Sequence, residues 1–213
     1  DEKGNIKWIS EYAIPITAFS GNSNYTISGY ANGAIRIHNN NDYKDMLEYF
    51  PGGSDYPVIY GVDISKDGNY FASVSGLNRQ RFVLAKKENN QAKIIYHEFL
   101  DSQINRRTLV KFVANNSKII FDIGNSVGIY DFEKEKASFI DVDKKIISIE
   151  EIGDMVFLLG KNNTDYTVYI LGKKNILLGS FSFEAETACI QTNNNSLFLG
   201  KDNSISKIEI TKE

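Results

Sequence analysis

Cysteine is almost absent from this sequence, and prolines and histidines are few. The chain has one cysteine, three prolines and two histidines among its 213 residues. A single thiol excludes an internal disulfide framework. Cys189 lies between Ala188 and Ile190, and this apolar setting predicts a buried, unreactive thiol rather than a nucleophile.

The two histidines leave little material for a metal site or a catalytic centre. Neither His38 nor His97 is paired with cysteines or carboxylates at the spacing of metal ligands, and neither belongs to a recognisable Ser-His-Asp arrangement. We therefore predict no catalytic residue, no bound metal, no cofactor and no enzymatic activity.

Long apolar runs and an excess of basic residues are also missing. No apolar run reaches the roughly 18 residues that a membrane-spanning helix needs, so no membrane span is predicted. The formal net charge of −3 argues against a nucleic-acid partner, which requires a basic face. The chain begins at Asp1, so the removal of a leader stays open. A periplasmic or cell-envelope location is preferred to a cytoplasmic one.

What the sequence does contain is a repeat of about 43 residues. Each of five segments has an apolar strand, a polar turn, a second apolar strand, a polar loop and an alternating strand. The second strand is followed by a glycine in every segment, at Gly29, Gly76, Gly124, Gly160 and Gly200. Asn, Asp and Gly fill the turns, where they tolerate the positive φ of a tight hairpin.

Four strands in a repeat of this length are typical of one propeller blade. We therefore predict an all-β fold, a single five-bladed β-propeller domain over residues 1–213. The blades are expected at residues 13–50, 58–100, 107–141, 145–183 and 185–213. Residues 5–12 alternate in polarity and are expected to complete the last blade as its fourth strand. A piece of a longer propeller and a two-sheet sandwich stay open as alternatives.

Three segments carry motifs of a known family. Residues 67–73 (DGNYFAS), 32–39 (NGAIRIHN) and 128–131 (GIYD) resemble the turn and strand motifs of WD repeats. The Trp-Asp pair of that family is replaced by His38-Asn39 and Tyr130-Asp131, and its Gly-His pair is missing. WD-repeat proteins are mostly interaction platforms, so the resemblance implies a scaffold that binds a partner.

Aligning the repeats places Asp63, Lys111 and Glu151 at equivalent positions on the innermost strands. Asp63 and Glu151 could serve as acid and base of a carbohydrate-active enzyme in a central funnel, or the funnel could bind a glycan. The preferred interpretation is structural. Lys111 would neutralise the two carboxylates, because unpaired buried charges are costly.

The longest loops are expected on one rim of the propeller. They carry the arginines and tyrosines Tyr56, Arg79, Arg81, Arg106, Arg107 and Tyr166. Arg and Tyr are enriched among residues that dominate binding energy, and guanidinium groups favour carboxylates. The predicted function is a non-enzymatic protein–protein interaction module or scaffold, whose rim binds a protein with acidic groups. A carbohydrate-active enzyme or glycan-binding propeller is the alternative.

Overall fold

The computed structural model describes residues 4–6, 9, 11–42, 44–101, 103–193 and 195–209. Nineteen strands form five antiparallel sheets, and none of the described residues lies in a helix. The prediction of an all-β fold with five repeated sheets is confirmed. Within these residues no helix is long and apolar enough to cross a membrane.

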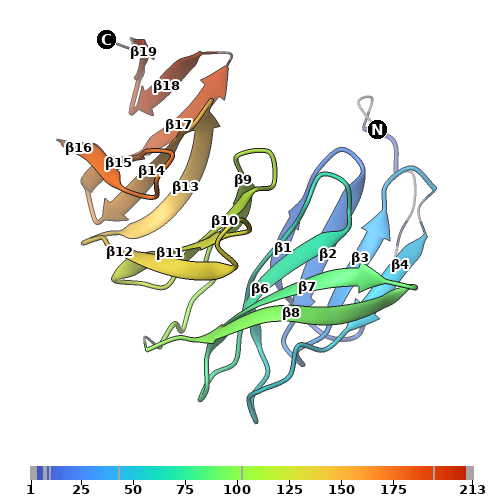
Figure 1. Cartoon of the computed structure of the whole chain (residues 1–213). Helices are drawn as coiled ribbons and strands as arrows, with labels where there is room; N and C mark the ends of the chain where they lie inside the picture. Colours follow the sequence, from blue (N-terminus) through green and yellow to red (C-terminus); the bar gives the residue numbers. More distant parts are fainter. Residues whose placement is uncertain are drawn as a thin grey trace. The chain divides into compact units, whose positions relative to one another are not determined.

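The chain divides into two compact units. Unit 1 contains Asp1–Phe99 and Asn105–Arg107, and unit 2 contains Leu100–Ile104 and Thr108–Glu213. The first sheet of unit 1 consists of β1 (Ile16–Gly21), β2 (Tyr25–Tyr30), β3 (Ile35–Asn39) and β4 (Asp45–Tyr49). Its second sheet consists of β5 (Ile59–Ile64), β6 (Tyr70–Ser75), β7 (Arg81–Glu88) and β8 (Gln91–Phe99) (Figure 1). In both sheets the strands pair in chain order, as successive hairpins require.

The turn between β5 and β6 shows why these segments form hairpins. Gly68 adopts a φ of +72°, a conformation that glycine reaches without steric cost. The Ser65 hydroxyl donates to the Asp67 carboxylate at 2.6 Å and accepts from the Tyr70 backbone N–H at 2.9 Å. Burial opposes ionisation of Asp67, but the hydrogen bonds that its carboxylate accepts from Ser65 and Asn69 outweigh this effect and lower its pKa. Local polar groups thus define the turn.

The core of unit 1 lies between its two sheets. Alternate residues of β2 and β3, such as Ile27 and Ile37, contact Ile59, Val62 and Phe71 of the second sheet. All five side chains are buried. Two-residue alternation along each strand produces this apolar face.

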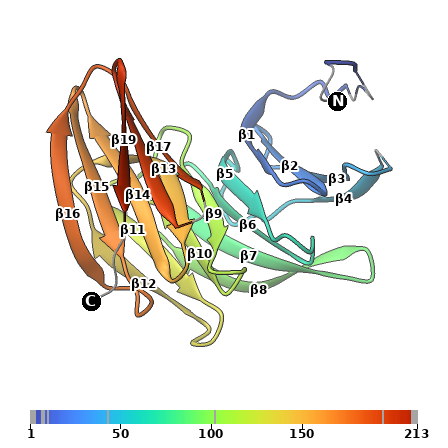
Figure 2. The same cartoon turned by 90° about the horizontal axis from the view of Figure 1, so that it is seen from above.

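Unit 2 contains the other three sheets, shown in Figure 2. The third sheet consists of β9 (Val110–Val113), β10 (Lys118–Asp122), β11 (Ser126–Asp131) and β12 (Lys136–Asp141). The fourth consists of β13 (Lys145–Ile152), β14 (Met155–Asn162), β15 (Asp165–Leu171) and β16 (Leu177–Glu184). The fifth consists of β17 (Ala188–Asn193), β18 (Ser196–Lys201) and β19 (Ser204–Glu209).

The fourth sheet is apolar on both faces and lies between the other two sheets of unit 2. On β14, Leu158 packs with the third sheet, whereas Phe157 and Leu159 pack with Ile190 and Leu199 of the fifth. A strand that is buried on both faces has a continuous run of apolar residues, as in residues 155–159.

The fifth sheet differs from the expectation that residues 5–12 complete it. Among the described residues, the fifth sheet has three strands. The described residues between positions 5 and 12 lie outside any strand; they are Asn5, Ile6, Ile9, Glu11 and Tyr12. Lys7, Trp8 and Ser10 lie outside the described residues. The Tyr12 ring instead packs on Tyr30 of β2 at 4.5 Å, with the Arg36 guanidinium 3.7 Å from its centroid. Aromatic and cation–π contacts therefore hold Tyr12 against the first sheet.

Candidate binding surface

Two loops of unit 1 meet at one end of the second sheet (Figure 1). One joins β4 to β5 and the other joins β6 to β7. Backbone N–H groups of Gly76 and Leu77 donate to the carbonyls of Val58 and Tyr56, both at 2.9 Å. The Asn78 side chain donates to the Asp55 carboxylate at 3.0 Å. Backbone and side-chain hydrogen bonds thus hold the two loops together.

The Arg81 side chain holds the loop between β4 and β5 in place. Its side chain is buried, with a residue exposure of 9%, and its guanidinium donates to the carbonyl of Pro51. Burial, together with the nearby positive charge of Arg79, lowers the pKa of Arg81. Gly53 has a φ of +86°, and a Cβ there would lie 2.5 Å from the Arg81 guanidinium carbon. Only glycine lets the loop pass so close to this side chain.

This burial corrects the expectation that Arg81 lies on an exposed rim. The residue begins β7 and pairs with Ser75 and Phe99 on the two neighbouring strands. A side chain at that position points into the loop that covers the sheet end. Arg81 therefore supports the loops from inside.

Large apolar side chains stand exposed around this anchored loop pair. Phe50, Tyr56, Leu77 and Phe99 are between 44% and 61% exposed. The exposed Arg79 places its guanidinium 4.8 Å from the centroid of the Phe99 ring. We call Phe50, Tyr56, Leu77, Arg79 and Phe99 the loop patch. Tyr56 and Arg79 were predicted from the sequence as binding residues, whereas Phe50, Leu77 and Phe99 were not.

The remaining predicted rim residues lie elsewhere. Arg107 is exposed and donates to the carbonyl of Phe19 on β1 at 3.0 Å, while Arg106 donates to the carbonyl of Arg107 at 3.3 Å. Tyr166 is in unit 2 and is 1% exposed. Its ring stacks on Phe183 with centroids 5.6 Å apart. The expected role of Tyr166 as a rim residue is therefore wrong, because its strand position faces the core between the fourth and fifth sheets.

The polar residues of the inner strands form bridges between neighbouring sheets. In unit 1, the Ser20 hydroxyl donates to the Asp63 carboxylate at 2.6 Å. In unit 2, Glu151 accepts from the backbone N–H of Ala114 at 2.6 Å. Lys111 donates to the Ile149 carbonyl and lies 3.6 Å from the carboxylate of Glu150.

These contacts correct the expectation that Lys111 neutralises Glu151. The carboxylate partner of Lys111 is Glu150, a residue that the repeat alignment passed over, whereas Glu151 accepts a hydrogen bond from an uncharged donor. The pairing of Lys111 with Asp63, a residue of unit 1, stays a prediction. Across the described ranges, no three His, Cys, Asp or Glu side chains gather as metal ligands would.

Glu150 joins the third, fourth and fifth sheets and yields a first prediction. Its carboxylate also accepts from the Thr192 hydroxyl at 2.9 Å and backbone N–H at 3.3 Å. Glu150→Ala should lower the free energy of unfolding by about 1–3 kcal/mol, because partly buried donors lose their acceptor. Urea unfolding followed by circular dichroism measures this change. Glu133→Ala, at an exposed position, is the matched control and should stay within about 0.5 kcal/mol.

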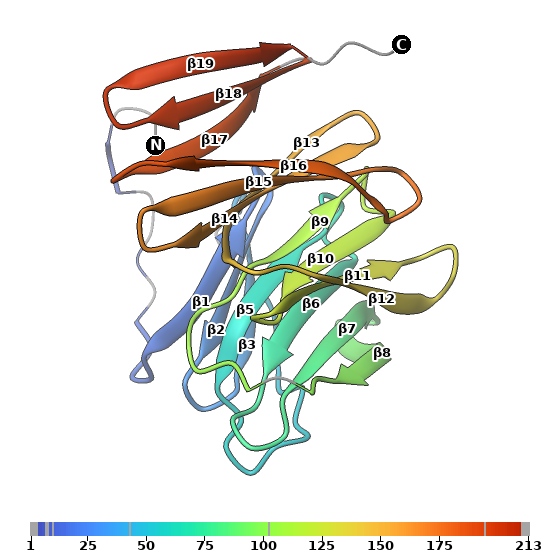
Figure 3. The ribbon, with the colours of Figure 1, turned by 90° about the vertical axis from the view of Figure 1, so that its left-hand side faces the viewer.

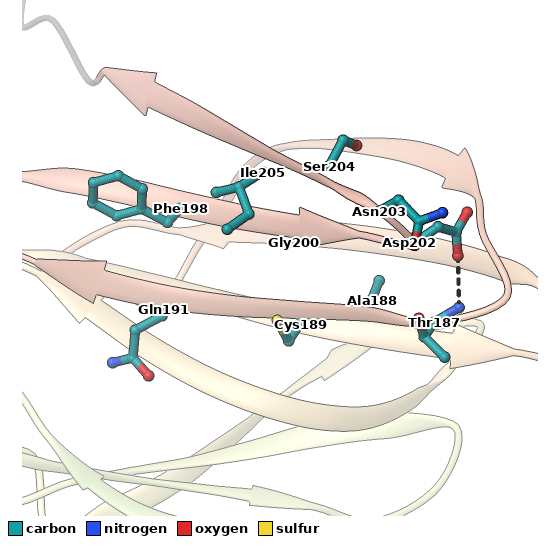
Figure 4. A pocket seen from close by; sticks show the side chains of 10 residues that line it. All are labelled: Thr187, Ala188, Cys189, Gln191, Phe198, Gly200, Asp202, Asn203, Ser204 and Ile205. Carbon is teal, nitrogen blue, oxygen red and sulfur yellow. Dashed lines mark hydrogen bonds between the residues drawn. The ribbon is translucent and has the colours of Figure 1, made fainter.

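A shallow hollow of about 560 Å³ lies on the fifth sheet (Figure 4). Its lining includes Cys189, Phe198, Gly200 and Ile205. The Cys189 thiol is exposed, which corrects the expectation of a buried one. Alternation along β17 turns Ile190 toward the core and its neighbour Cys189 away from it. A Cβ at Gly200 would lie 2.7 Å from the sulfur, so the glycine makes room for the thiol.

Comparison with known proteins identifies the fold family. A family model described as a beta-propeller protein matches residues 1–213. The chain belongs to this beta-propeller family. An uncharacterized protein of Treponema pallidum (strain Nichols) is 24% identical to the propeller over 212 residues. That alignment covers 99% of this chain and 56% of the relative, so the propeller chain spans little more than half of that protein's length.

The five sheets fit the blades of such a propeller. The first resembles a WD repeat in residues 32–39, where His38 is buried and its Nδ1 lies 2.7 Å from the Asp45 carboxylate. A packed strand-end histidine thus occupies the place where WD repeats have tryptophan. The finer resemblance of the propeller to WD repeats stays a prediction.

Proposed function

We propose that this propeller is a non-enzymatic protein-interaction module, and that the loop patch of unit 1 is its binding surface. The observation that carries the proposal is the group of large exposed apolar side chains on one pair of anchored loops. Clustered apolar exposure costs solvation free energy, and on soluble proteins it marks interaction sites. Single exposed apolar residues would need no such explanation.

The anchoring of the loops also supports binding. Association is costly when loops become ordered in the complex, and that cost falls when they are held in place beforehand. Arg81, Asn78 and Gly53 hold the backbone that presents Tyr56 and Leu77. Aromatic rings on such a support add large contact area with few rotatable bonds.

The chemistry of the patch favours a partner with both apolar and acidic groups. Tyr56, Leu77 and Phe99 offer an apolar surface, and Arg79 adds one positive charge at its border. Arg79 already lies over Phe99, so a carboxylate from a partner could bind a guanidinium that is held in place. We therefore propose a protein segment with an apolar side chain next to Asp or Glu.

The inner-strand carboxylates support a non-enzymatic role rather than glycan hydrolysis. Asp63, Glu150 and Glu151 each accept hydrogen bonds that connect neighbouring sheets. A general acid and base must exchange protons with a substrate, whereas these groups have structural partners. The bridging contacts give each carboxylate a structural purpose.

A second prediction tests the loop patch directly. A photo-crosslinking amino acid at position 56 should capture a defined protein partner in cells, and the same group at Ile205 in unit 2 is the matched control. With the captured partner purified, Tyr56→Ala and Leu77→Asp should each weaken binding at least tenfold in calorimetric titrations. Circular dichroism should show an unchanged fold. Full affinity in both variants would refute the proposed surface.

A further inference from the structure

Four buried polar side chains lie together in unit 1, where its two sheets meet the loop after β4. Figure 3 shows these two sheets next to each other. The four residues are Tyr49, which ends β4, Ser73 and Ser75 of β6, and Arg81, which begins β7. None of them is more than 9% exposed. Within the described part of the chain, the three hydroxyl groups and the Nε–H of Arg81 have no hydrogen-bond partner. Buried polar groups are nearly always hydrogen-bonded, so this cluster indicates a ligand.

Strand pairing brings the four side chains to one place. Ser73 and Ser75 are two residues apart on β6 and therefore point to the same face of the second sheet, where Arg81 is the direct partner of Ser75. Phe71 points to that face too, and its ring packs on the Tyr49 ring with centroids 5.1 Å apart. The Tyr49 hydroxyl lies beside Ser73 and close enough to Arg81 for the guanidinium charge to act on it.

The cluster is rich in hydrogen-bond donors and carries a positive charge. The guanidinium of Arg81 only donates, and serine hydroxyls can donate as well. Burial raises the pKa of Tyr49, so its phenol stays protonated and can also donate. No carboxylate of the described residues lies within ion-pair distance of Arg81. Because a buried charge without a counter-charge is costly, this site favours an anion.

The loop that covers the cluster limits the size of the ligand. A Cβ at Gly53 would lie 2.5 Å from Cζ, 2.6 Å from Nε and 2.9 Å from Nη1 of Arg81, so the loop lies over the flat face of the guanidinium. The N–H groups lie in the guanidinium plane, and a contact on the face leaves its edge able to donate. Since the cluster is buried under this loop, the ligand that fits is a small free anion, not a carboxylate of a partner protein.

We propose that Tyr49, Ser73, Ser75 and Arg81 bind one monovalent anion of the size of chloride. One negative charge neutralises the single guanidinium, and the Nε–H supplies a charge-assisted hydrogen bond. The bound anion connects β4, β6 and β7 beneath the loop that presents Tyr56. The inference goes beyond the proposed function and does not depend on it, because the site is internal and involves no protein partner.

Urea unfolding of the full chain in increasing sodium chloride tests the proposal. Sodium gluconate keeps the ionic strength constant, and its anion is too large for a site under the loop. A ligand that binds only the folded chain stabilises it in proportion to the logarithm of one plus the ratio of its concentration to its dissociation constant. We therefore expect the urea midpoint to rise with chloride concentration. A midpoint that is independent of chloride would overturn the proposal.

Variants of the cluster identify the donors. Arg81→Gln should abolish the chloride dependence. Ser75→Ala removes one donor and keeps the charge, so the apparent dissociation constant of chloride should rise about tenfold or more, and this variant decides the matter if Arg81→Gln does not fold. Ser28→Ala is the matched control, because Ser28 is equally buried but its hydroxyl donates to the Tyr30 hydroxyl at 3.1 Å. It should leave the constant within about twofold. Equal chloride dependence in the two serine variants would contradict the assigned donors.

Anomalous diffraction from crystals grown in sodium bromide locates the ion. We expect a bromide peak within hydrogen-bond distance of the Arg81 Nε and the Ser75 hydroxyl. Bromide peaks that lie only at other places would overturn the proposal. So would a peak at the cluster in a chain whose stability does not respond to chloride, since that result indicates an adventitious ion only.

Discussion

Tyr166→Ala is expected to lower the free energy of unfolding by about 3–5 kcal/mol. The side chain is 1% exposed and lies in the cluster that joins the fourth and fifth sheets. Its ring stacks on Phe183 at an interplanar angle of 9°. Removal of the ring leaves a cavity between two sheets that cannot close without moving both. Urea unfolding followed by circular dichroism measures the loss.

Tyr166→Phe is the control for this prediction. It keeps the stacked ring and removes only the hydroxyl, which donates to the Glu186 carbonyl at 3.3 Å. The expected loss is about 0.5–1.5 kcal/mol. If Tyr166→Ala were to leave stability within about 0.5 kcal/mol of the natural chain, the assignment of Tyr166 to the core would be contradicted.

Arg81→Ala is expected to lower the free energy of unfolding by about 2–4 kcal/mol, from a lost charged hydrogen bond and lost packing. The guanidinium donates to the Pro51 carbonyl and fills the space beside Gly53. Without it, the loop that presents Tyr56 loses its support. The loss of stability should therefore be accompanied by faster amide exchange in residues 51–57, measured by hydrogen–deuterium exchange.

Arg79→Ala separates support from binding. Arg79 is exposed and lies over the Phe99 ring, so its removal should change stability by no more than about 0.5 kcal/mol. The same change should weaken binding to a partner, because Arg79 is the charged member of the loop patch. Equal losses of stability in the Arg79 and Arg81 variants would contradict the different burial of the two residues.

These contrasts show how one short segment combines two tasks. Arg79 and Arg81 are two residues apart, and strand alternation does not explain their difference because Arg79 precedes β7. The loop between β4 and β5 folds over Arg81 and leaves Arg79 outside. Two glycines with positive φ, Gly52 and Gly53, allow the loop to approach so closely. Support and recognition are therefore built from neighbouring residues of the same chemical type.

Local patterns determined the strands and turns of this propeller. Asn, Asp and Gly in the turns, such as Gly68, fix hairpins through backbone conformation and short-range hydrogen bonds. Alternation in segments such as residues 25–30 and 35–39 fixes which face is apolar. Both signals act between residues close in sequence, so the five repeated sheets could be predicted without knowledge of their packing.

Only the tertiary structure decided which polar and aromatic side chains are accessible. Sequence reasoning gave the wrong accessibility to three side chains. It predicted that Tyr166 and Arg81 are exposed and that Cys189 is buried, and the structure shows the opposite in each case. Glu150 was passed over for Glu151, because the sequence does not show where the bulges of β5 and β13 lie; counted from these bulges, Glu150 corresponds to Asp63. Burial depends on what a neighbouring sheet or loop covers, and that neighbour is supplied by residues distant along the chain. A one-residue shift of register reverses the side of the sheet on which a side chain lies.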